Sequence, residues 1–257
     1  MHRQQKVIYY TDELNDEFAE DHIAPRKIDG RYRYIRNDMP GRALHIFWYR
    51  TIAIPLATLY MKLYFHHKIV NKKVLKDVTD QGYFFYGNHT HFLADALIPT
   101  MVNMPKDVAV VVHPNNVSMP VLGRITPSLG ALPLPGDMKA ARHFIRAIEH
   151  KIDHKSCVMI YPEAHIWPYY TKIRPFKDVS FRYPVQCKAP VFCLTNTYQK
   201  QRFFKRPRMV TYIDGPFYPD TALSAKEQKR QLRDEVYQKM TERASHSDMI
   251  VIKYEKV

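Results

Sequence analysis

The sequence predicts an α/β fold, in which a mostly parallel, twisted sheet is flanked by helices. The main observation is that short apolar runs of strand length alternate with helical patterns from Lys68 onward. Such alternation is typical of parallel sheets, because a crossover between parallel strands usually contains a helix. The chain is also large enough for a core of this kind, since it has 257 residues, of which 46% are hydrophobic.

The individual elements are predicted from their composition and their boundary residues. The run 83–86 is aromatic and lies between Gly82 and Gly87, which indicates a buried strand. Ser224 is followed three residues later by Glu227, a pair that is typical of a helix N-terminus. Further strands are predicted at 108–112, 157–161, 191–194 and 209–213, and further helices at 94–101 and 138–151.

Three regions follow from the distribution of polar and apolar residues. Residues 1–42 are polar and are predicted to form an extension of low regularity, and residues 68–257 are predicted to form the α/β domain. Residues 43–67 are the most apolar, and we expect a helix or a helical hairpin that lies in the membrane interface. The uncharged run between Arg50 and Lys62 is shorter than the roughly 20 residues that a spanning helix needs. An ordinary core helix is the alternative for this segment.

The charge balance favours an anionic partner. Lys and Arg total 39 against 25 Asp and Glu, which gives a net charge of +14. This excess suits a phospholipid surface, nucleic acid or a phosphate-bearing substrate such as a coenzyme thioester, and a generally basic surface is the alternative. No nucleic-acid-binding motif accompanies the charge. We therefore expect a membrane phospholipid surface, and no nucleic acid, as a partner.

The cysteines and the N-terminus indicate a cytoplasmic protein. Cys157, Cys187 and Cys193 are odd in number, and none of their spacings is typical of a metal-binding pair. A reducing compartment is therefore expected rather than a disulfide scaffold. The first 20 residues are polar and acidic, without the apolar stretch of a signal peptide. Together with the basic charge, these features predict a peripheral position on the inner face of the cell membrane.

The candidate catalytic residues lie where the strand 83–86 meets the helix 94–101. His89 and His91 occupy the connection, and an imidazole titrates near neutral pH, so it can accept and return a proton. Asp95 lies six residues after His89 and four after His91, and either spacing lets its carboxylate fix the tautomer of the imidazole. The alternative is that both histidines are polar loop residues and that Asp95 faces solvent.

A second polar cluster follows the strand 157–161 and contains Glu163 and His165. Polar groups just beyond the carboxyl ends of parallel strands converge on one crevice. We therefore expect these two side chains to face the site that contains His89. The alternative for Glu163 is an exposed loop carboxylate.

Four blocks in this order resemble the glycerolipid (lysophospholipid) acyltransferase family, in particular the bacterial 1-acylglycerol-3-phosphate acyltransferases. The resemblance covers about residues 45–240. Its specificity comes from the order and spacing of the blocks together. The blocks are Gly87-Asn88-His89 through Asp95; 119–123 with 129–134; Tyr161-Pro162-Glu163 with 174–177; and Ala189-Pro190-Val191 with Asp214-Gly215-Pro216.

The resemblance implies transfer of a fatty acyl group from an acyl-CoA or acyl-carrier-protein thioester to a hydroxyl of a lysophospholipid-like acceptor. His89 would be the general base and Asp95 its orienting partner, while backbone N–H groups after Asn88 would serve the oxyanion. Neither motif contains a Cys or Ser nucleophile, which fits direct transfer. No cofactor and no metal are implied beyond the donor thioester. The candidate substrate-binding residues are His91, Glu163, His165, Lys172 and Arg174.

The chain departs from the family pattern at three places. Five residues rather than four separate His89 from Asp95, and the preceding Asn88 favours His89 over His91 as the base. Pro135 and Ile166 stand where the family has arginines that contact the acceptor phosphate. Either nearby cations replace those arginines, or the acceptor lacks the phosphate. The candidate replacements are Lys172, Arg174 and Lys139.

Two other functions are compatible with the same residues. A metal-dependent hydrolase would use zinc ligands from the set His89, His91, Asp95, Glu163 and His165. A non-catalytic membrane-surface module would use the basic charge and the apolar segment alone. Bound metal and turnover of an acyl thioester, respectively, distinguish these alternatives from an acyltransferase.

Overall fold

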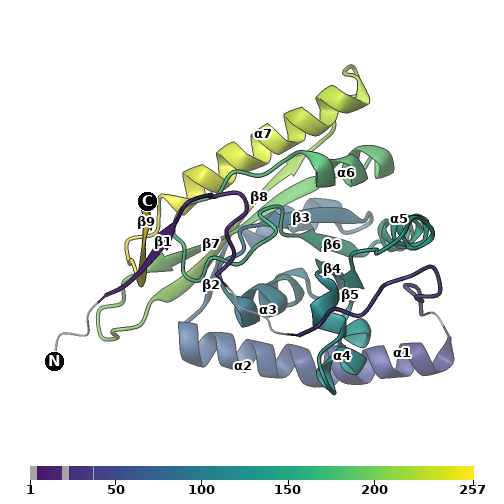
Figure 1. Ribbon diagram of the computed structural model, residues 1–257, viewed down its shortest axis with the longest axis horizontal. Helices are drawn as coiled ribbons and strands as arrows, with labels where there is room; N and C mark the ends of the chain where they lie inside the picture. Colours follow the sequence, from purple (N-terminus) through teal and green to yellow (C-terminus); the bar gives the residue numbers. More distant parts are fainter. Residues whose placement is uncertain (1–4, 19–22, 37) are drawn as a thin grey trace.

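The computed structural model describes residues 5–18, 23–36 and 38–257. Its centre is a seven-stranded sheet with the order β2-β8-β7-β3-β6-β4-β5 (Figure 1). All neighbouring strands are parallel except β7 and β8, so the predicted α/β class is confirmed. The strands are β2 (Lys68–Val70), β3 (Tyr83–Gly87), β4 (Val108–Val112), β5 (Ala131–Pro133), β6 (Cys157–Ile160), β7 (Val191–Gln199) and β8 (Arg208–Phe217).

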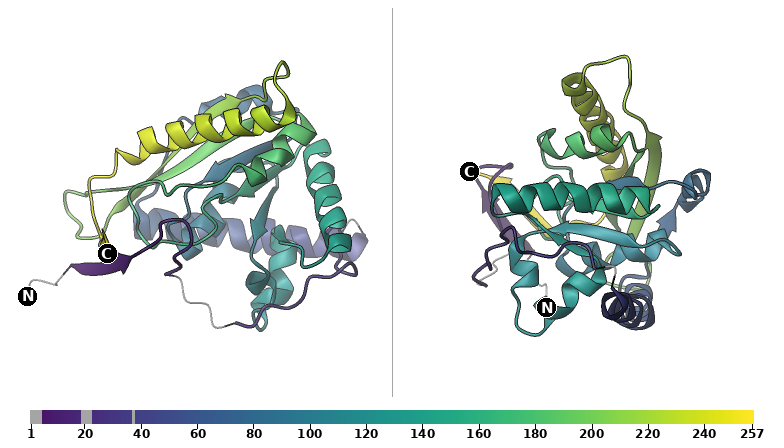
Figure 2. Two further views of the ribbon diagram at one scale, coloured as in Figure 1. Left: turned by 45° about the horizontal axis from the view of Figure 1, so that its top comes forward. Right: turned by 90° about the vertical axis from the view of Figure 1, so that its right-hand side faces the viewer.

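Helices cover both faces of the sheet, and alternate strand residues contact each layer. On β3, Phe84 and Tyr86 belong to the core beneath α5 and α7, whereas Tyr83 and Phe85 belong to the core beneath α2 and α3. Figure 2 shows the two helical layers from other directions. The longer helices are α2 (Ile54–Phe65), α3 (Phe92–Asn103), α5 (Met138–Asp153) and α7 (Ala225–Ala244).

Side-chain caps explain where several helices begin. The Ser224 hydroxyl and the Glu227 carboxylate cap each other's backbone N–H groups at the start of α7, as predicted. Asp137 Oδ1 accepts a hydrogen bond from Ala140 N at the start of α5. The short helical turns are α4 (Leu122–Ile125), α6 (Arg182–Cys187) and the 3₁₀ turns η2 (Lys72–Val78), η3 (Pro114–Val117), η4 (Thr126–Leu129) and η5 (Val179–Phe181).

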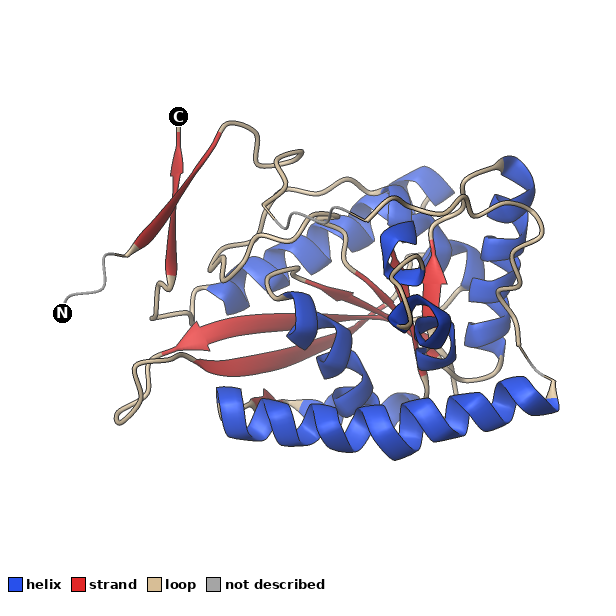
Figure 3. Cartoon of the chain, turned by 60° about the horizontal axis from the view of Figure 1, so that its bottom comes forward, coloured by secondary structure: helices blue, strands red, loops and turns tan. Residues whose placement is uncertain are grey.

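The apolar N-terminal segment forms one continuous helix, which runs along one side of the molecule (Figure 3). Its parts are α1 (Met39–His45), a π-helical stretch η1 (Ile46–Ala53) and α2. Pro55 lies in the first turn of α2, directly after the wider π turns, and so the helix continues past it. The structure therefore excludes the helical hairpin that was the other expectation.

This long helix is part of the core along one side only. Tyr49, Ala57, Met61 and Phe65 are buried, and the Tyr49 hydroxyl accepts a hydrogen bond from Val108 N at 3.0 Å. Nowhere in the described ranges is a helix both long and apolar enough to cross a membrane. The helix is thus a structural element of the domain, and its contact with a membrane remains a prediction.

The N-terminal region is more ordered than expected. β1 (Lys6–Tyr10) pairs in parallel with β9 (Ile252–Lys256) in a separate two-stranded sheet, which brings the two ends of the chain together (Figures 1 and 2). The prediction of low regularity for residues 1–42 is therefore wrong at β1. Its partner lies at the other end of the chain, so no local pattern could reveal the pairing. Residues 1–4, 19–22 and 37 of that region lie outside the described residues.

Candidate active site

The predicted site lies at the carboxyl edge of the central sheet, where β3 and β6 end. His89 follows β3, and Tyr161 and Glu163 follow β6, which is the neighbour of β3. Asn196 comes from β7, the neighbour of β3 on its other side. Residues from three adjacent strands thus surround the start of α3.

Asp95 is the centre of the hydrogen-bond network. His89 Nδ1 donates to Asp95 Oδ2 at 2.9 Å, and the backbone N–H groups of Thr90 and His91 donate to the same oxygen at 2.8 Å each. The amide of Asn196 donates to Oδ1 at 3.2 Å. The carboxylate is almost completely buried. Because Nδ1 carries the proton that faces Asp95, Nε2 of His89 is left as an acceptor.

The two histidines have different positions. His91 is the N-cap of α3, and its Nδ1 accepts a hydrogen bond from Ala94 N at 3.1 Å. Burial lowers the pKa of His91, which keeps the ring neutral and able to accept that bond. Its ring also lies edge-on to the rings of Phe65 and Tyr169. The geometry therefore pairs Asp95 with His89, whereas His91 caps the N-terminus of α3.

Tyr161 supports the imidazole from the side. Its ring stacks on His89 with a centroid separation of 4.4 Å and an interplanar angle of 17°. Its hydroxyl donates to the backbone carbonyl of Asp95. Burial raises the pKa of Tyr161 well above its ordinary value, so the hydroxyl keeps its proton. The tyrosine thus joins the catalytic candidate to the first turn of α3.

Glu163 and Arg174 form a buried ion pair beneath the site rather than facing a substrate. Glu163 Oε2 accepts from His89 N at 3.1 Å, and Oε1 accepts from Arg174 N at 3.0 Å. The guanidinium lies 3.6 Å from Oε2, donates to the carbonyl oxygens of Glu163 and His165, and packs over the Trp167 ring. Burial raises the pKa of Glu163, and the charge of Arg174 opposes that rise.

Neither member of this pair has the exposed surface that a substrate contact would need in this conformation, since the side chains are 1% and 0% exposed. The expected substrate-binding roles of Glu163 and Arg174 therefore find no support in the structure. Instead, the pair holds the backbone at His89. Lys172 is exposed, and it has no carboxylate partner in the described part of the chain.

The N-terminal segment covers the loop after β6, which sequence patterns did not indicate. Trp167 Nε1 donates to the carbonyl of Asp16 at 2.8 Å, and the Tyr170 hydroxyl donates to Glu13 Oε1 at 3.1 Å. His165 Nδ1 lies 3.4 Å from the Glu17 carboxylate. We expected His165 to face the site that contains His89. In the structure its side chain instead contacts this covering segment.

Two further buried residues, Asn196 and Tyr198, belong to the site and were not predicted from the sequence. The Asn88 amide and the Asn196 backbone exchange two hydrogen bonds of 2.9 and 2.8 Å, which continue the β3–β7 pairing past the strand end. The Tyr198 hydroxyl lies 3.0 Å from Thr90 Oγ1. A signal did exist in the sequence, because the polar run 195–197 directly follows an apolar strand pattern.

Two details of the predicted chemistry change. The backbone N–H groups of His89, Thr90 and His91, which were expected to serve the oxyanion, already donate to the carboxylates of Glu163 and Asp95. In addition, the described residues include no group of three or more His, Cys, Asp or Glu side chains placed to hold a metal ion. The geometry thus gives no support to the hydrolase alternative.

Comparison with known proteins shows which class of protein uses this fold. No family model and no curated protein matches the sequence. Among solved structures, however, the chain has the fold of an acyltransferase. That protein is the 1-acyl-sn-glycerophosphate (LPA) acyltransferase PlsC from Thermotoga maritima, with a TM-score of 0.52 and 14% sequence identity over 82% of this chain and 84% of that chain. At this identity, the similarity establishes the fold.

Proposed function

We propose that the protein is an acyltransferase that moves a fatty acyl group from a thioester donor to a hydroxyl of a lysophospholipid-like acceptor. The observation that carries the proposal is the His89–Asp95 pair at the end of β3, where Asp95 is held by three further donors. The acyltransferase fold and the four sequence blocks support the same function. The direct test is incubation with an acyl-CoA and a panel of lysolipids, followed by mass spectrometry of the lipid products.

The pair supplies the proton transfers that this reaction needs. Nε2 of His89 takes the proton of the acceptor hydroxyl as the oxygen forms a bond to the thioester carbonyl carbon. When the tetrahedral intermediate collapses, the C–S bond breaks and the imidazolium returns the proton to the thiolate. Asp95 stabilises the imidazolium between these two steps. No covalent acyl-enzyme is required.

Binding to a membrane surface is the second part of the proposal, because the acceptor is a lipid. The outer side of the long helix carries Leu44, Phe47, Leu56, Leu59 and Leu63, each between 46% and 62% exposed. They occur in two groups, Leu44 with Phe47 and Leu56 with Leu59 and Leu63, and within each group neighbours are three or four residues apart and therefore share one side of the helix. Phe92 and Leu93, at the start of α3 a few residues after the candidate base, are also exposed, and α3 packs against α2. An interfacial helix in this position, on the cytoplasmic side of an anionic membrane, would bring lipid acceptors to His89.

We expect the double variant Leu56→Glu/Leu63→Glu to bind anionic vesicles at least about tenfold more weakly than the wild type in sedimentation assays. Two carboxylates would replace apolar groups that leave water on binding. Val179→Glu is the matched control, because Val179 is 59% exposed but lies beside α6 on the other face of the sheet. Equal loss in both variants would contradict an orientation set by the long helix. Deletion of residues 1–65 is unsuitable, since that segment contributes to the core.

The acceptor phosphate is proposed to contact Lys172, because Arg174 is buried and Pro135 and Ile166 have no side-chain donors. Lys172→Ala should raise KM for lysophosphatidate by about tenfold and leave KM for an unphosphorylated monoacylglycerol unchanged. Lys226→Ala, an exposed lysine on α7, serves as the control. If the wild type prefers monoacylglycerol, the phosphate contact is absent and the missing arginines mark a different acceptor.

A further inference from the structure

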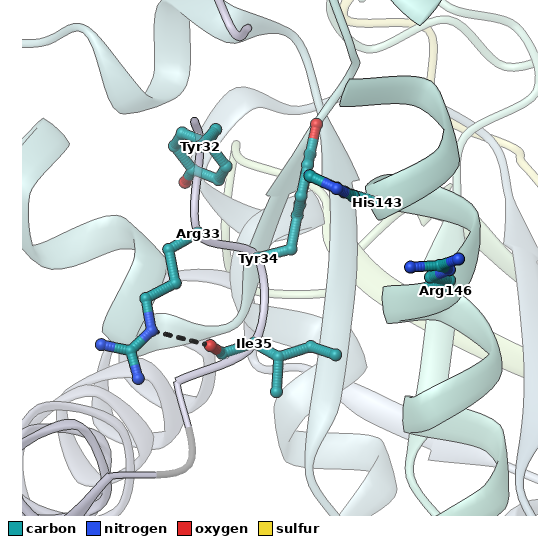
Figure 4. A pocket seen from close by; sticks show the side chains of 6 residues that line it. All are labelled: Tyr32, Arg33, Tyr34, Ile35, His143 and Arg146. Atoms are coloured by element: carbon teal, nitrogen blue, oxygen red, sulfur yellow. Dashed lines mark hydrogen bonds between the residues drawn. The ribbon is translucent and has the colours of Figure 1, made fainter. Parts of the chain in front are cut away.

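A basic surface groove lies between α5 and the segment 32–35 (Figure 4). Its lining residues do not include His89, Asp95 or their hydrogen-bond partners. Lys139, Arg142, His143 and Arg146 share one side of α5, because they are spaced by three, four and seven residues. They line a hollow of about 270 Å³. A second hollow of about 240 Å³ adjoins it, shares His143 and Arg146, and is closed on its other side by the segment 32–35.

Three of the cations on the α5 side of this groove have no carboxylate partner among the described residues. In the described part of the chain, Lys139, Arg142 and Arg146 form no ion pair, whereas Arg33 at the rim pairs with Asp38. The contrast is α7, where four cations each pair with a carboxylate. Those pairs are Lys229–Asp178, Arg233–Asp234, Lys239–Glu242 and Arg243–Asp214.

Like charges at these spacings repel one another and destabilise a helix. An ordinary solvated helix face relieves this repulsion with interspersed acids, as α7 does. On α5, Glu149 lies three residues after Arg146 and therefore on the same side, but its carboxylate accepts a hydrogen bond from Gln186 and forms no ion pair with Arg142 or Arg146. A bound anion would neutralise the cluster.

The opposite wall of the groove is aromatic. Tyr34 is fixed by a hydrogen bond from its hydroxyl to the carbonyl of Pro133 and by edge contact with Phe144. The Tyr32 hydroxyl is buried, and it has no hydrogen-bond partner among the described residues. Arg26 lies over the Tyr32 ring at 5.7 Å. Cations beside aromatic rings suit a phosphorylated nucleoside, in which the base packs on rings and phosphates meet arginines.

The position of the groove shows which substrate could reach it. α5 begins just after β5. The pairing registers from β3 through β6 and β4 to β5 place the carboxyl ends of β3 and β5 at the same height in the sheet. β5 lies three strand spacings from β3, or about 14 Å. The phosphate of a lysophosphatidate sits next to the attacking hydroxyl and cannot span this separation. The phosphates of coenzyme A are attached to the thioester through a long flexible arm, and they can.

We infer that this groove binds the phosphorylated adenosine end of a coenzyme A thioester, so that acyl-CoA rather than an acyl-carrier protein is the donor. The inference rests on the proposed acyltransferase function. Hollows lined by cations and aromatic rings suit the phosphorylated nucleoside of coenzyme A, a group that an acyl-carrier protein lacks.

The test uses adenosine 3′,5′-bisphosphate as the probe and calorimetry on the full chain. The wild type should bind the probe, and Arg142→Gln/Arg146→Gln should weaken that binding at least about tenfold. Arg230→Gln, an exposed arginine on α7, should leave it unchanged. In acyl-transfer assays, the double variant should raise KM for acyl-CoA with little change in kcat, because the groove does not touch the reacting atoms.

Several outcomes would overturn the inference. They are no binding of the probe by the wild type, equal binding by the double variant, or a raised KM for an acyl-carrier-protein donor alone. The last outcome would assign the groove to the carrier protein. The calorimetric binding measurement needs no turnover. A failure of the acyltransferase function can therefore be distinguished from a failure of the groove to bind the probe. Probe binding without any acyl transfer would contradict the proposed acyltransferase function. Acyl transfer without probe binding would contradict the assignment of the groove to coenzyme A.

Discussion

His89→Ala is expected to abolish acyl transfer while leaving the protein folded. Among the described residues, His89 is the histidine that pairs with Asp95, and in the proposed mechanism its Nε2 takes the proton of the acceptor hydroxyl. Loss of a general base whose partners remain in place lowers kcat by orders of magnitude, here at least about 10²–10⁴-fold. Product formation measured by mass spectrometry, with far-UV circular dichroism to check folding, gives the answer.

Asp95→Asn should reduce kcat by a similar factor for a related reason. The amide can keep a hydrogen bond to the imidazole, but it lacks the charge that stabilises the imidazolium. It also brings an NH₂ group toward the donors that now bond to the carboxylate, which are Thr90 N, His91 N and the Asn196 amide.

His91→Ala is the matched control for both variants. It removes the helix cap at Ala94 and should cost about 1 kcal/mol of stability while most of the turnover remains. If His91→Ala loses turnover and His89→Ala keeps it, the assignment of the base is wrong. If neither variant loses turnover, the acyltransferase function itself fails.

Arg174→Met is expected to destabilise the protein by about 3–5 kcal/mol, the largest effect that we expect from any single change outside the catalytic pair. It would leave the Glu163 carboxylate buried, because that side chain is only 1% exposed and its oxygens face His89 N and Arg174 N. Removal of one partner of a buried pair leaves an uncompensated charge. Urea unfolding monitored by tryptophan fluorescence measures the change.

The pH dependence separates charge from packing in this variant. Burial already raises the pKa of Glu163 above its ordinary value, and without Arg174 the rise becomes larger. A carboxyl group whose pKa is raised in the folded state favours folding at low pH and opposes it as pH increases through that pKa. The stability difference between variant and wild type should therefore shrink as pH falls toward about 5. A constant difference would indicate lost packing alone.

Two control variants accompany this measurement. Lys239→Ala breaks the surface pair with Glu242 and should change stability by less than about 1 kcal/mol. The double variant Glu163→Gln/Arg174→Met removes both charges and should recover part of the stability that Arg174→Met loses. No recovery in the double variant would show that the charge of Glu163 is not the cause.

The strands and helices of the core were predictable because their signals are local. The aromatic run of β3, the apolar runs of β4 and β6 and the capping box of α7 each contain within a few residues what determines the element. The same holds for the His89–Asp95 pair, whose members are separated by one strand-to-helix turn. Lengthening that turn by one residue, compared with the family pattern, still allows the hydrogen bond.

Other parts of the fold and the site depend on residues that are far apart in the chain. Asn196 reaches Asp95 across 101 positions, and the β1–β9 pair joins the two ends. Periodicity does not report such contacts, because it describes which face of an element is apolar and not which element covers it. For the same reason, nothing local indicated that the segment with Glu13 and Asp16 would cover the loop after β6.

By itself, the sequence determined the α/β class, the order of the core elements and the candidate base with its carboxylate partner. Only the tertiary structure decided that Glu163 and Arg174 are a buried pair behind the site and that His91 caps a helix. It also decided that the basic residues of α5 line a groove rather than an ordinary solvated face. The physical reason is that a charged side chain has the same local pattern in all of these roles. Its burial and its partners, which set its energy and its chemistry, are properties of the folded chain.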